Sequence, residues 1–263
     1  QAAINPLFNI IESLSENTFD VAKYTYMPTE EAQRYTQALL PENRWEKKND
    51  IFTTSRPNIV LVILESFSSN AYEAMPNLMR LKEEGIYLSN AYSSSYRTDR
   101  GIVALMSAFP GQPTSSLMTV PSKSQNLPQI GKVLKQEGYV SHFYYGGDED
   151  FTNMRSYLID GGFENRVVDK DFPIQDRISK WGVPDPVVLD RAATEILKHY
   201  EEYPKSKYFD VILTLSSHEP FEVPFDRFPE DKIQNSFAYT DHCLGHFIDR
   251  LKQLPAWKDL LVI

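Results

Sequence analysis

Residues 94–102, Ser-Ser-Tyr-Arg-Thr-Asp-Arg-Gly-Ile, place a hydroxyl, a carboxylate and two guanidinium groups at the start of a predicted helix. At that position free backbone amides and the positive end of the helix favour an anion beside the hydroxyl of Thr98. A threonine hydroxyl becomes an effective nucleophile when a metal makes it more acidic or a base takes its proton. The segment therefore predicts a metal-dependent transferase or hydrolase of phosphate or sulfate esters. The alternative is that Thr98 or Asp99 is only a helix cap, worth about 1 kcal/mol.

Glu65 is a candidate metal ligand because it directly follows the apolar run 59–64, which is typical of a strand covered on both faces. A carboxylate at the mouth of such a strand suits a hard divalent cation such as Mg²⁺ or Mn²⁺, which prefers oxygen ligands. The alternative is that Glu65 caps the first turn of the next helix.

His218 and a pair of glycines follow two other predicted strands, 208–215 and 139–145. An imidazole after a strand can bind a phosphate oxygen or give a proton to a leaving alkoxide. A loop histidine bonded to backbone is the ordinary alternative. Gly146 and Gly147 allow a ligand to approach the backbone closely, or they form a turn and nothing more.

The elements that must position these residues alternate along the chain. The apolar patterns predict strands at 59–64, 86–91, 139–145, 208–215 and from 260 onward, and helices at 75–84, 99–108, 127–137, 186–200 and 234–254. This alternation predicts an α/β fold in which a mainly parallel sheet is sandwiched by helices. In such a sheet the ligand site lies beyond the carboxyl ends of the strands, where all four candidate segments fall.

Two regions of the chain differ in their residue patterns. Residues 1–55 predict an irregular arm with scattered prolines and a helix-like patch at 30–40, whereas 56–263 carry the alternating strands and helices. No apolar run approaches the roughly 18 residues that indicate a membrane-spanning helix. The chain starts at Gln1 without a signal-like segment and stops inside a predicted strand at Ile263. We therefore expect a fragment, truncated at its C-terminus.

The charge balance and the cysteine count argue against some classes of protein. The 27 Lys and Arg residues against 36 Asp and Glu residues give a net charge of −9, which argues against binding of nucleic acid through its phosphates. The single cysteine, Cys243, excludes an internal disulfide and a Cys-rich metal site. His242 and His246 have the i, i+4 spacing of a zinc site but lie within an amphipathic helical pattern. We interpret them as helix-flank residues, and Cys243 as a packed side chain.

Four motifs, taken in their order along the chain, carry a resemblance to a known family. They are a strand followed by Glu65-Ser66, Arg-Thr-Asp-Arg-Gly at 97–101, Tyr-Gly-Gly-Asp at 145–148 with Phe151 and Asn153, and Ser-His-Glu-Pro-Phe at 217–221. This order resembles the lipoteichoic acid synthase group, phosphoglycerol transferases of the alkaline phosphatase and sulfatase superfamily. The resemblance implies an alkaline phosphatase-like fold for 56–263.

The resemblance also implies a role for each matched residue. Glu65 corresponds to the family's metal-binding glutamate, Thr98 to its nucleophile and metal ligand, and His218 to its substrate-binding histidine. One divalent cation is expected, Mn²⁺ or Mg²⁺, with Zn²⁺ as an alternative. Arg97 or Arg100 would offset the phosphoryl charge, unless one of them pairs with a neighbouring carboxylate.

The segment after the third predicted strand departs from the family's pattern. The form Tyr-Gly-Gly-Asp at 145–148 is similar to members from Gram-negative bacteria. In lipoteichoic acid synthases proper, a Trp and an Arg hold the phosphoglycerol where this chain has Thr152 and Met154. Asn153 and Arg155 are candidates to serve instead, and Asp148 is a further candidate for substrate binding.

The family's pattern implies parts that lie beyond the sequence given. An Asp-His pair just after the strand starting at Leu260 completes the family's metal site, and several transmembrane helices precede the catalytic domain. The resemblance thus implies an enzyme of the inner membrane with this domain on the periplasmic or external side. It would transfer phosphoglycerol or phosphoethanolamine between an anionic lipid head group and an acceptor in the envelope, through a covalent intermediate on Thr98.

Two alternatives stay open at this stage. Sulfatases are the nearest rival, but they use a formylglycine made from Cys or Ser in a C/S-x-P-x-R context, where this chain has Thr-Asp-Arg-Gly at 98–101. That difference favours phosphate over sulfate. The second alternative is a non-catalytic binding domain that keeps the fold and has an incomplete metal site.

Overall fold

The computed structural model describes residues 25–39, 54–113 and 115–263 and divides the chain into two units, Gln1–Thr53 and Thr54–Ile263. In the first unit the described element is helix α2, Thr29–Leu39, which coincides with the predicted helical patch. The remainder of the predicted arm before residue 54 lies outside the described residues, apart from 25–28.

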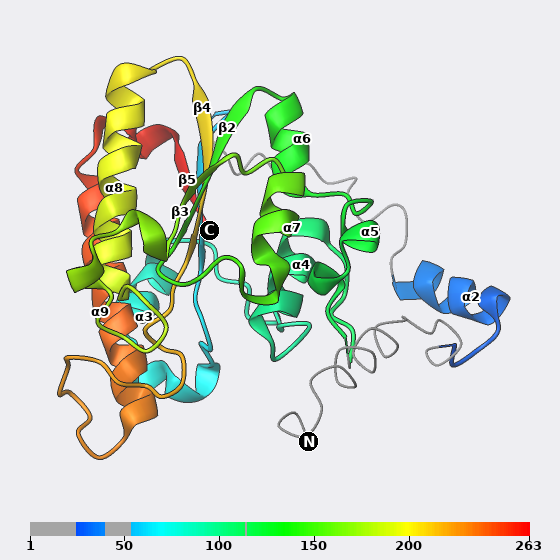
Figure 1. Ribbon diagram of the computed structural model, residues 1–263, viewed down its shortest axis with the longest axis horizontal. Helices are drawn as coiled ribbons and strands as arrows, with labels where there is room; N and C mark the ends of the chain where they lie inside the picture. The colour runs from blue at the N-terminus through cyan, green and yellow to red at the C-terminus, as the bar shows by residue number, and fades with distance from the viewer. Residues whose placement is uncertain (1–24, 40–53, 114) are drawn as a thin grey trace, which may run out of the picture. The chain divides into compact units, whose positions relative to one another are not determined.

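A five-stranded parallel sheet forms the centre of the second unit (Figure 1). Its strands are ordered β3-β2-β4-β1-β5, and every pairing is parallel. Their bounds are β1 Asn58–Ile63, β2 Tyr139–Tyr145, β3 Asn165–Val167, β4 Lys207–Leu213 and β5 Leu260–Val262. The predicted parallel α/β sheet is confirmed.

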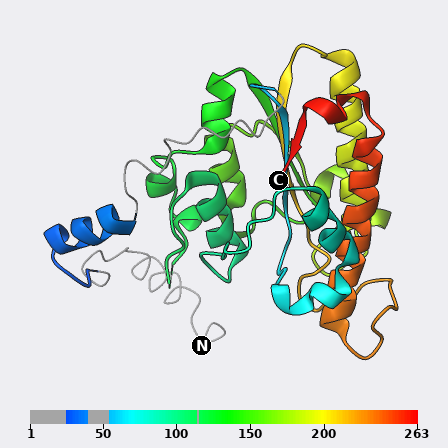
Figure 2. The same ribbon diagram turned by 180° about the vertical axis from the view of Figure 1, so that it is seen from behind.

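Helices cover both faces of this sheet (Figures 1 and 2). On one face lie α3 Pro76–Glu84, α8 Asp185–Glu202 and α9 Lys232–Lys252. On the other lie α4 Thr98–Ser107, α5 Pro121–Ser124, α6 Ile130–Gln136 and α7 Met154–Asp160. Short 3₁₀ helices connect them, at Ser69–Ala74, Leu117–Thr119, Phe151–Asn153, Asp169–Asp171, Ile174–Asp176 and Pro255–Asp259. Among the described helices none is both long and apolar enough to cross a bilayer.

One predicted strand is wrong. Residues 86–91 carry the alternation of a strand, yet they form no strand, and Ile86 and Leu88 are each 72% exposed. A strand needs a hydrogen-bonded neighbour, and within the described residues none of the strand pairings includes 86–91. The residue types of 86–91 favour a strand, but they do not show whether another strand is available to form hydrogen bonds with it.

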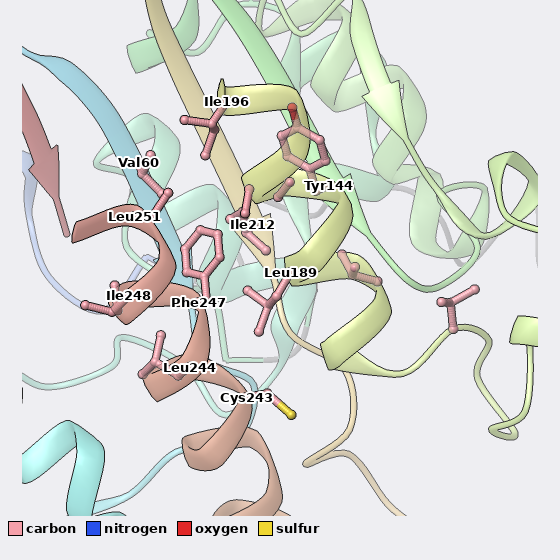
Figure 3. Packing of buried hydrophobic residues seen from close by; sticks show 14 of the residues in the cluster. Val60, Tyr144, Leu189, Ile196, Ile212, Cys243, Leu244, Phe247, Ile248 and Leu251 are labelled. Atoms are coloured by element: carbon pink, nitrogen blue, oxygen red, sulfur yellow. The ribbon is translucent and has the colours of Figure 1, made fainter. Parts of the chain in front are cut away.

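Alternate residues of the central strands supply two separate cores. In β4, Tyr208 and Ile212 face α8 and α9, whereas Phe209, Val211 and Leu213 face α4 and α7. This period of two buries both faces, which explains why the central strands have near-continuous apolar sequences. Side chains of both helices and the sheet meet in the first core (Figure 3), among them Val60, Leu189, Ile196, Ile212, Leu244, Phe247, Ile248 and Leu251.

Replacing Ile248 by Ala should lower the free energy of unfolding by about 2–5 kcal/mol, because Ile248 is 2% exposed and its loss leaves a cavity between α9 and the sheet. Ile233 lies on the same helix but is 49% exposed. The Ile233→Ala variant is the matched control and should lose less than about 1 kcal/mol. Urea unfolding followed by circular dichroism measures both, and equal losses would contradict the packing described.

A cluster of polar side chains lies between β2, β4 and α8. His142 Nδ1 lies 2.7 Å from Oδ1 of Asp210, and the ring of His199 meets that of His142 edge to face at 5.8 Å. Nε2 of His199 is buried without a hydrogen-bond partner. Burial, followed by the neighbouring His142, lowers the pKa of His199, because a charged imidazole there would lose its hydration.

We expect the protein to lose stability as the pH falls below about 6.5, the ordinary pKa of an unfolded histidine. Unfolded His199 takes up its proton first, since the folded pKa is lower, so protonation favours unfolding in that window. Burial raises the pKa of Asp210, so proton uptake by folded Asp210 acts in the opposite direction as the pH falls from that raised value toward the ordinary pKa of an aspartate. Thermal midpoints between about pH 7.5 and 5 should fall less steeply in His199→Phe than in the wild type, and the exposed His246→Phe variant should keep the wild-type slope.

Candidate active site

Glu65 and Thr98 are brought into direct contact by the fold. Strand β1 ends at Ile63, and Glu65 lies two residues beyond it, while Thr98 is the first residue of α4. The hydroxyl Oγ1 of Thr98 donates a hydrogen bond of 2.9 Å to Oε2 of Glu65. Two residues that are 33 positions apart in sequence therefore share one site beyond the carboxyl end of the sheet.

The alternative capping roles are wrong for both residues. Helix α4 has Arg97 at its N-cap, and no side chain caps it, so neither Thr98 nor Asp99 serves that purpose. The 3₁₀ helix that follows Glu65 is capped by Ser68, whose hydroxyl accepts from the amide of Asn70. The Thr98 hydroxyl and the Glu65 carboxylate are thus directed at each other and not at helix amides.

Three hydroxyl groups hold Glu65 in place. Its amide donates to Oγ1 of Thr214 at 2.8 Å, its carbonyl oxygen accepts from Oγ of Ser217 at 2.6 Å, and its Oε1 accepts from Oγ of Ser66 at 3.1 Å. Ser66 itself has a φ of +61°, a conformation that non-glycine residues rarely adopt. Such backbone strain persists where surrounding contacts enforce it, and it is common at functional sites.

Tyr145, the last residue of β2, is a part of this site that the sequence analysis did not single out. Burial and then the charges of Glu65 and Asp148 raise the pKa of Tyr145 far above its usual value. Its hydroxyl therefore stays protonated and able to donate a hydrogen bond. A Cβ at Gly147 would lie 2.6 Å from that hydroxyl, so a larger residue there would displace the ring of Tyr145. Its position at a strand end next to the glycine pair was the available signal.

Gly146 packs against the backbone of Val183. Its carbonyl accepts from the amide of Val183 at 2.8 Å, and a Cβ at Gly146 would lie 2.0 Å from the Val183 carbonyl oxygen. The close approach that glycine permits here is to the backbone of Val183.

Both arginines that flank Thr98 have partners. Nε of Arg97 lies 3.8 Å from Oδ1 of Asp99, which is the alternative pairing left open above. Nη1 of Arg100 donates to the carbonyl of Pro113 at 2.7 Å, and its guanidinium lies 5.7 Å from the ring centre of Tyr96. Roles for Arg97 and Arg100 in binding a phosphoryl group remain predictions.

The candidates of the 148–155 segment make local contacts. Asp148 is exposed and accepts from the amide of Asp150 at 2.8 Å, which makes it a turn residue. Asn153, with a φ of +64°, donates through Nδ2 to the carbonyl of Met118 at 3.1 Å. Arg155 pairs with Asp150 at 2.7 Å and with a second carboxylate. Substrate contacts by Asp148, Asn153 or Arg155 remain predictions.

That second carboxylate, Glu149, stabilises the segment and was missed in the sequence. It is buried and ion-paired with Arg166 at 2.8 Å, Lys170 at 2.8 Å and Arg155 at 3.2 Å. Burial alone would raise the pKa of Glu149, but Lys170 and Arg166 outweigh it and hold that pKa below its usual value. Two of the three cations, Arg166 and Lys170, lie 17 and 21 positions from Glu149, so no local pattern marks the cluster.

His218 lines a pocket of about 290 Å³ next to the loop that supports Glu65. Its Nδ1 lies 2.9 Å from the carbonyl oxygen of Glu219, and its ring meets the indole of Trp181 edge to face at 4.7 Å. The backbone contact expected of an ordinary loop histidine is present, yet the ring is also available from the pocket. Lys180 and Glu222 complete the charged part of the lining.

Glu65 and Thr98 together fit part of a cation site. Their side chains present oxygen atoms, the donor type that Mg²⁺ and Mn²⁺ prefer, at hydrogen-bond distance from each other. In the part of the chain that the structure describes, no group of three or more His, Cys, Asp and Glu residues could hold a metal ion. A cation held by Glu65 and Thr98 stays a prediction.

The histidines of α9 do not belong to this site. His242 and His246 are exposed, their rings meet edge to face at 4.5 Å, and they line a groove of about 650 Å³ between α8 and α9. Cys243 between them is buried, and burial raises the pKa of its thiol to about 12. They are helix-flank residues and a packed thiol, as the amphipathic pattern indicates.

Residues 57–263, most of the chain, match the sulfatase family. The chain belongs to the sulfatase family. Among curated proteins it is similar to phosphoglycerol transferase I of Xanthomonas campestris pv. campestris (strain B100), with 29% identity over 245 residues. That alignment covers 79% of this chain and 33% of the relative, so the chain spans about a third of the relative's length.

Solved structures agree with the predicted fold. A protein of the alkaline phosphatase superfamily from Vibrio parahaemolyticus superposes with a TM-score of 0.74 and 26% identity, covering 80% of this chain and 54% of that one. The lipoteichoic acid synthase LtaP of Listeria monocytogenes superposes with a TM-score of 0.70 and 21% identity, covering 82% and 57%. The second likeness supports the fold alone.

Replacing Ser217 by Ala should lower the free energy of unfolding by about 1–3 kcal/mol, since the carbonyl of Glu65 would lose its donor in a buried position. The exposed Ser122→Ala variant serves as a control that removes a hydroxyl without burial. Chemical unfolding of both variants measures the difference, and an unchanged stability in Ser217→Ala would show that the contact does not hold Glu65.

Proposed function

We propose that this protein is a metal-dependent phosphotransferase that acts on a phosphodiester of an anionic lipid head group, with Thr98 as its nucleophile. The observation that carries the proposal is the 2.9 Å hydrogen bond from the Thr98 hydroxyl to Glu65 at the start of α4. A hydroxyl with a carboxylate partner at the positive end of a helix is placed to attack a phosphorus atom. Similarity to phosphoglycerol transferase I supports phosphoglycerol as the transferred group, and phosphoethanolamine is the alternative.

The proposed reaction proceeds in two displacements at phosphorus. In the first, Oγ1 of Thr98 forms a bond to phosphorus, its proton passes to Oε2 of Glu65, and the bond from phosphorus to the lipid alcohol breaks. The leaving oxygen takes a proton from His218. In the second, the hydroxyl of an envelope acceptor, or water, attacks phosphorus and releases Thr98, which regains its proton from Glu65. The attacking hydroxyl returns a proton to His218, so protons balance over the cycle.

Glu65 and Thr98 would hold the expected divalent cation, Mn²⁺ or Mg²⁺, with Zn²⁺ as the alternative. When bound, the cation would make the Thr98 hydroxyl more acidic and offset the charge on the phosphoryl oxygens. Tyr145 contributes a protonated hydroxyl, and Arg97 and Arg100 contribute positive charge beside the nucleophile. We place the protein at the inner membrane with this domain on the periplasmic side, which its similarity to a Gram-negative phosphoglycerol transferase supports.

A sulfatase activity is the second candidate, because the family that matches carries that name. The residue in the nucleophile position argues against it, since Thr98 cannot be converted to the formylglycine that those enzymes make from Cys or Ser. The full-length protein should therefore cleave an aryl phosphodiester with added Mn²⁺ and leave an aryl sulfate intact. Faster cleavage of the sulfate would replace phosphoryl transfer as the proposed function, and failure on both esters would favour the binding-domain alternative.

Thr98→Ala should reduce turnover of phosphatidylglycerol and of an aryl phosphodiester by about 10³-fold or more, because the nucleophile is removed. The fold should persist, as the hydroxyl caps no helix. Thr98→Ser is the matched control, which keeps a hydroxyl and should retain measurable turnover. Acid-quenched wild-type reactions with phosphatidylglycerol should contain a peptide in which Thr98 carries the phosphoglycerol group, detected by mass spectrometry. Turnover retained by Thr98→Ala would reject Thr98 as the nucleophile.

A further inference from the structure

A buried carboxylate at the start of α8 holds the loop that carries His218. Asp185 is 2% exposed, and its Oδ1 accepts from the amides of Leu215 at 2.6 Å and Ser216 at 3.1 Å. Its Oδ2 accepts from the hydroxyl of Thr240 on α9 at 2.7 Å. The amide of Asp185 in turn donates to Oγ of Ser216 at 2.9 Å. The carboxylate is thus fully engaged by groups from two other segments.

Trp181, four residues earlier, holds the far end of the same loop. Its Nε1 donates to the carbonyl of Glu219 at 2.5 Å, and its ring packs edge to face against His218. The segment 181–185 therefore contacts both ends of residues 215–219, which we call the His218 loop. A loop fixed at two ends has few conformations left for the residues between them.

Ser217 and His218 lie between the two fixed ends of the His218 loop. Ser217 donates to the carbonyl of Glu65, and the next residue, His218, lines the pocket of about 290 Å³. Any displacement of the Leu215 and Ser216 amides would therefore move two groups at once, the support of Glu65 and the imidazole of His218. Asp185 itself touches neither Glu65 nor Thr98 through any contact seen in the described residues.

We propose that Asp185 is a positioning residue for the proposed phosphoryl transfer, which sets the His218 loop so that Ser217 supports Glu65 and His218 faces the reacting phosphate. The assignment rests on the proposed function. A local capping role does not explain the contacts, because no side chain caps α8 and the oxygens of Asp185 go to other elements. Asparagine at 185 keeps the size, and its NH₂ group can donate to Oγ1 of Thr240, but it replaces the charged acceptor of the Leu215 and Ser216 amides by a weaker neutral one.

Asp241 provides a matched control. It is also fully buried and accepts from the amides of Asn77 at 3.0 Å and Leu78 at 2.8 Å and from Nδ2 of Asn77 at 3.0 Å, all at the start of α3. Asp185→Asn and Asp241→Asn therefore each replace a buried carboxylate that accepts from backbone amides by a neutral amide. Both should destabilise the protein by comparable amounts, which chemical unfolding measures. Only Asp185 contacts the His218 loop.

In the full-length protein, Asp185→Asn should lower kcat on an aryl phosphodiester at least about 10-fold below Asp241→Asn, with a smaller change in KM, at a temperature where both are folded. Trp181→Phe keeps the ring but loses its N–H donor, and it should fall between the two. Equal kcat in Asp185→Asn and Asp241→Asn would overturn the proposal, because a purely structural role predicts that equality.

A second measurement does not depend on turnover. Labelling with diethyl pyrocarbonate, read by peptide mass spectrometry, should modify His218 at a different rate in Asp185→Asn, with the exposed His242 and His246 as internal references that stay unchanged. Unchanged labelling of His218 would overturn the proposal even if kcat falls. If the wild type cleaves no phosphodiester, the proposed function fails, and the labelling still decides whether Asp185 positions His218.

Discussion

The parallel pairing of β1 with β4 is the constraint on which the site depends. The two strands pair over five residues that end with Ile63 opposite Leu213, and the amide of Thr214 continues the ladder to the carbonyl of Ile63. Because parallel strands in register end at the same edge, the chain leaving β1 and the chain leaving β4 run side by side. That proximity lets hydroxyls after β4 hold Glu65 by its backbone. A shift of one residue in register would turn the apolar side chains of one strand to the opposite face.

Burial on both faces is what keeps that register. Each strand of the central pair contributes alternate side chains to two separate cores, one under α8 and α9 and one under α4 and α7. The helices are held by the same cores, so the start of α4, with Thr98, and the start of α8, with Asp185, are positioned relative to one sheet edge. The chemistry proposed for the site uses the beginnings of these helices, while their apolar faces supply the stability.

Charge is arranged locally in a chain that is acidic overall. The net charge is −9, yet the cations near Thr98 and on the 148–155 segment are each paired with a carboxylate or a carbonyl. Such pairing fixes long side chains that would otherwise lose conformational entropy on binding an anion. Membership of the sulfatase family and the resemblance to a solved structure of the alkaline phosphatase superfamily agree with the parallel α/β fold that brings these residues to one edge.

What the sequence determined by itself was local. The apolar runs predicted β1, β2 and β4 to within two residues, because burial on both faces leaves a continuous apolar signal, and the motif order indicated Glu65, Thr98 and His218. Short elements such as β3 and α7 carry too few residues for a periodic signal, and 86–91 has a strand pattern without a pairing partner. Only the tertiary structure decided that Thr98 contacts Glu65 instead of capping α4, and that Asp185 holds the His218 loop. Contacts between residues far apart in sequence depend on strand register and helix placement, which no local pattern specifies.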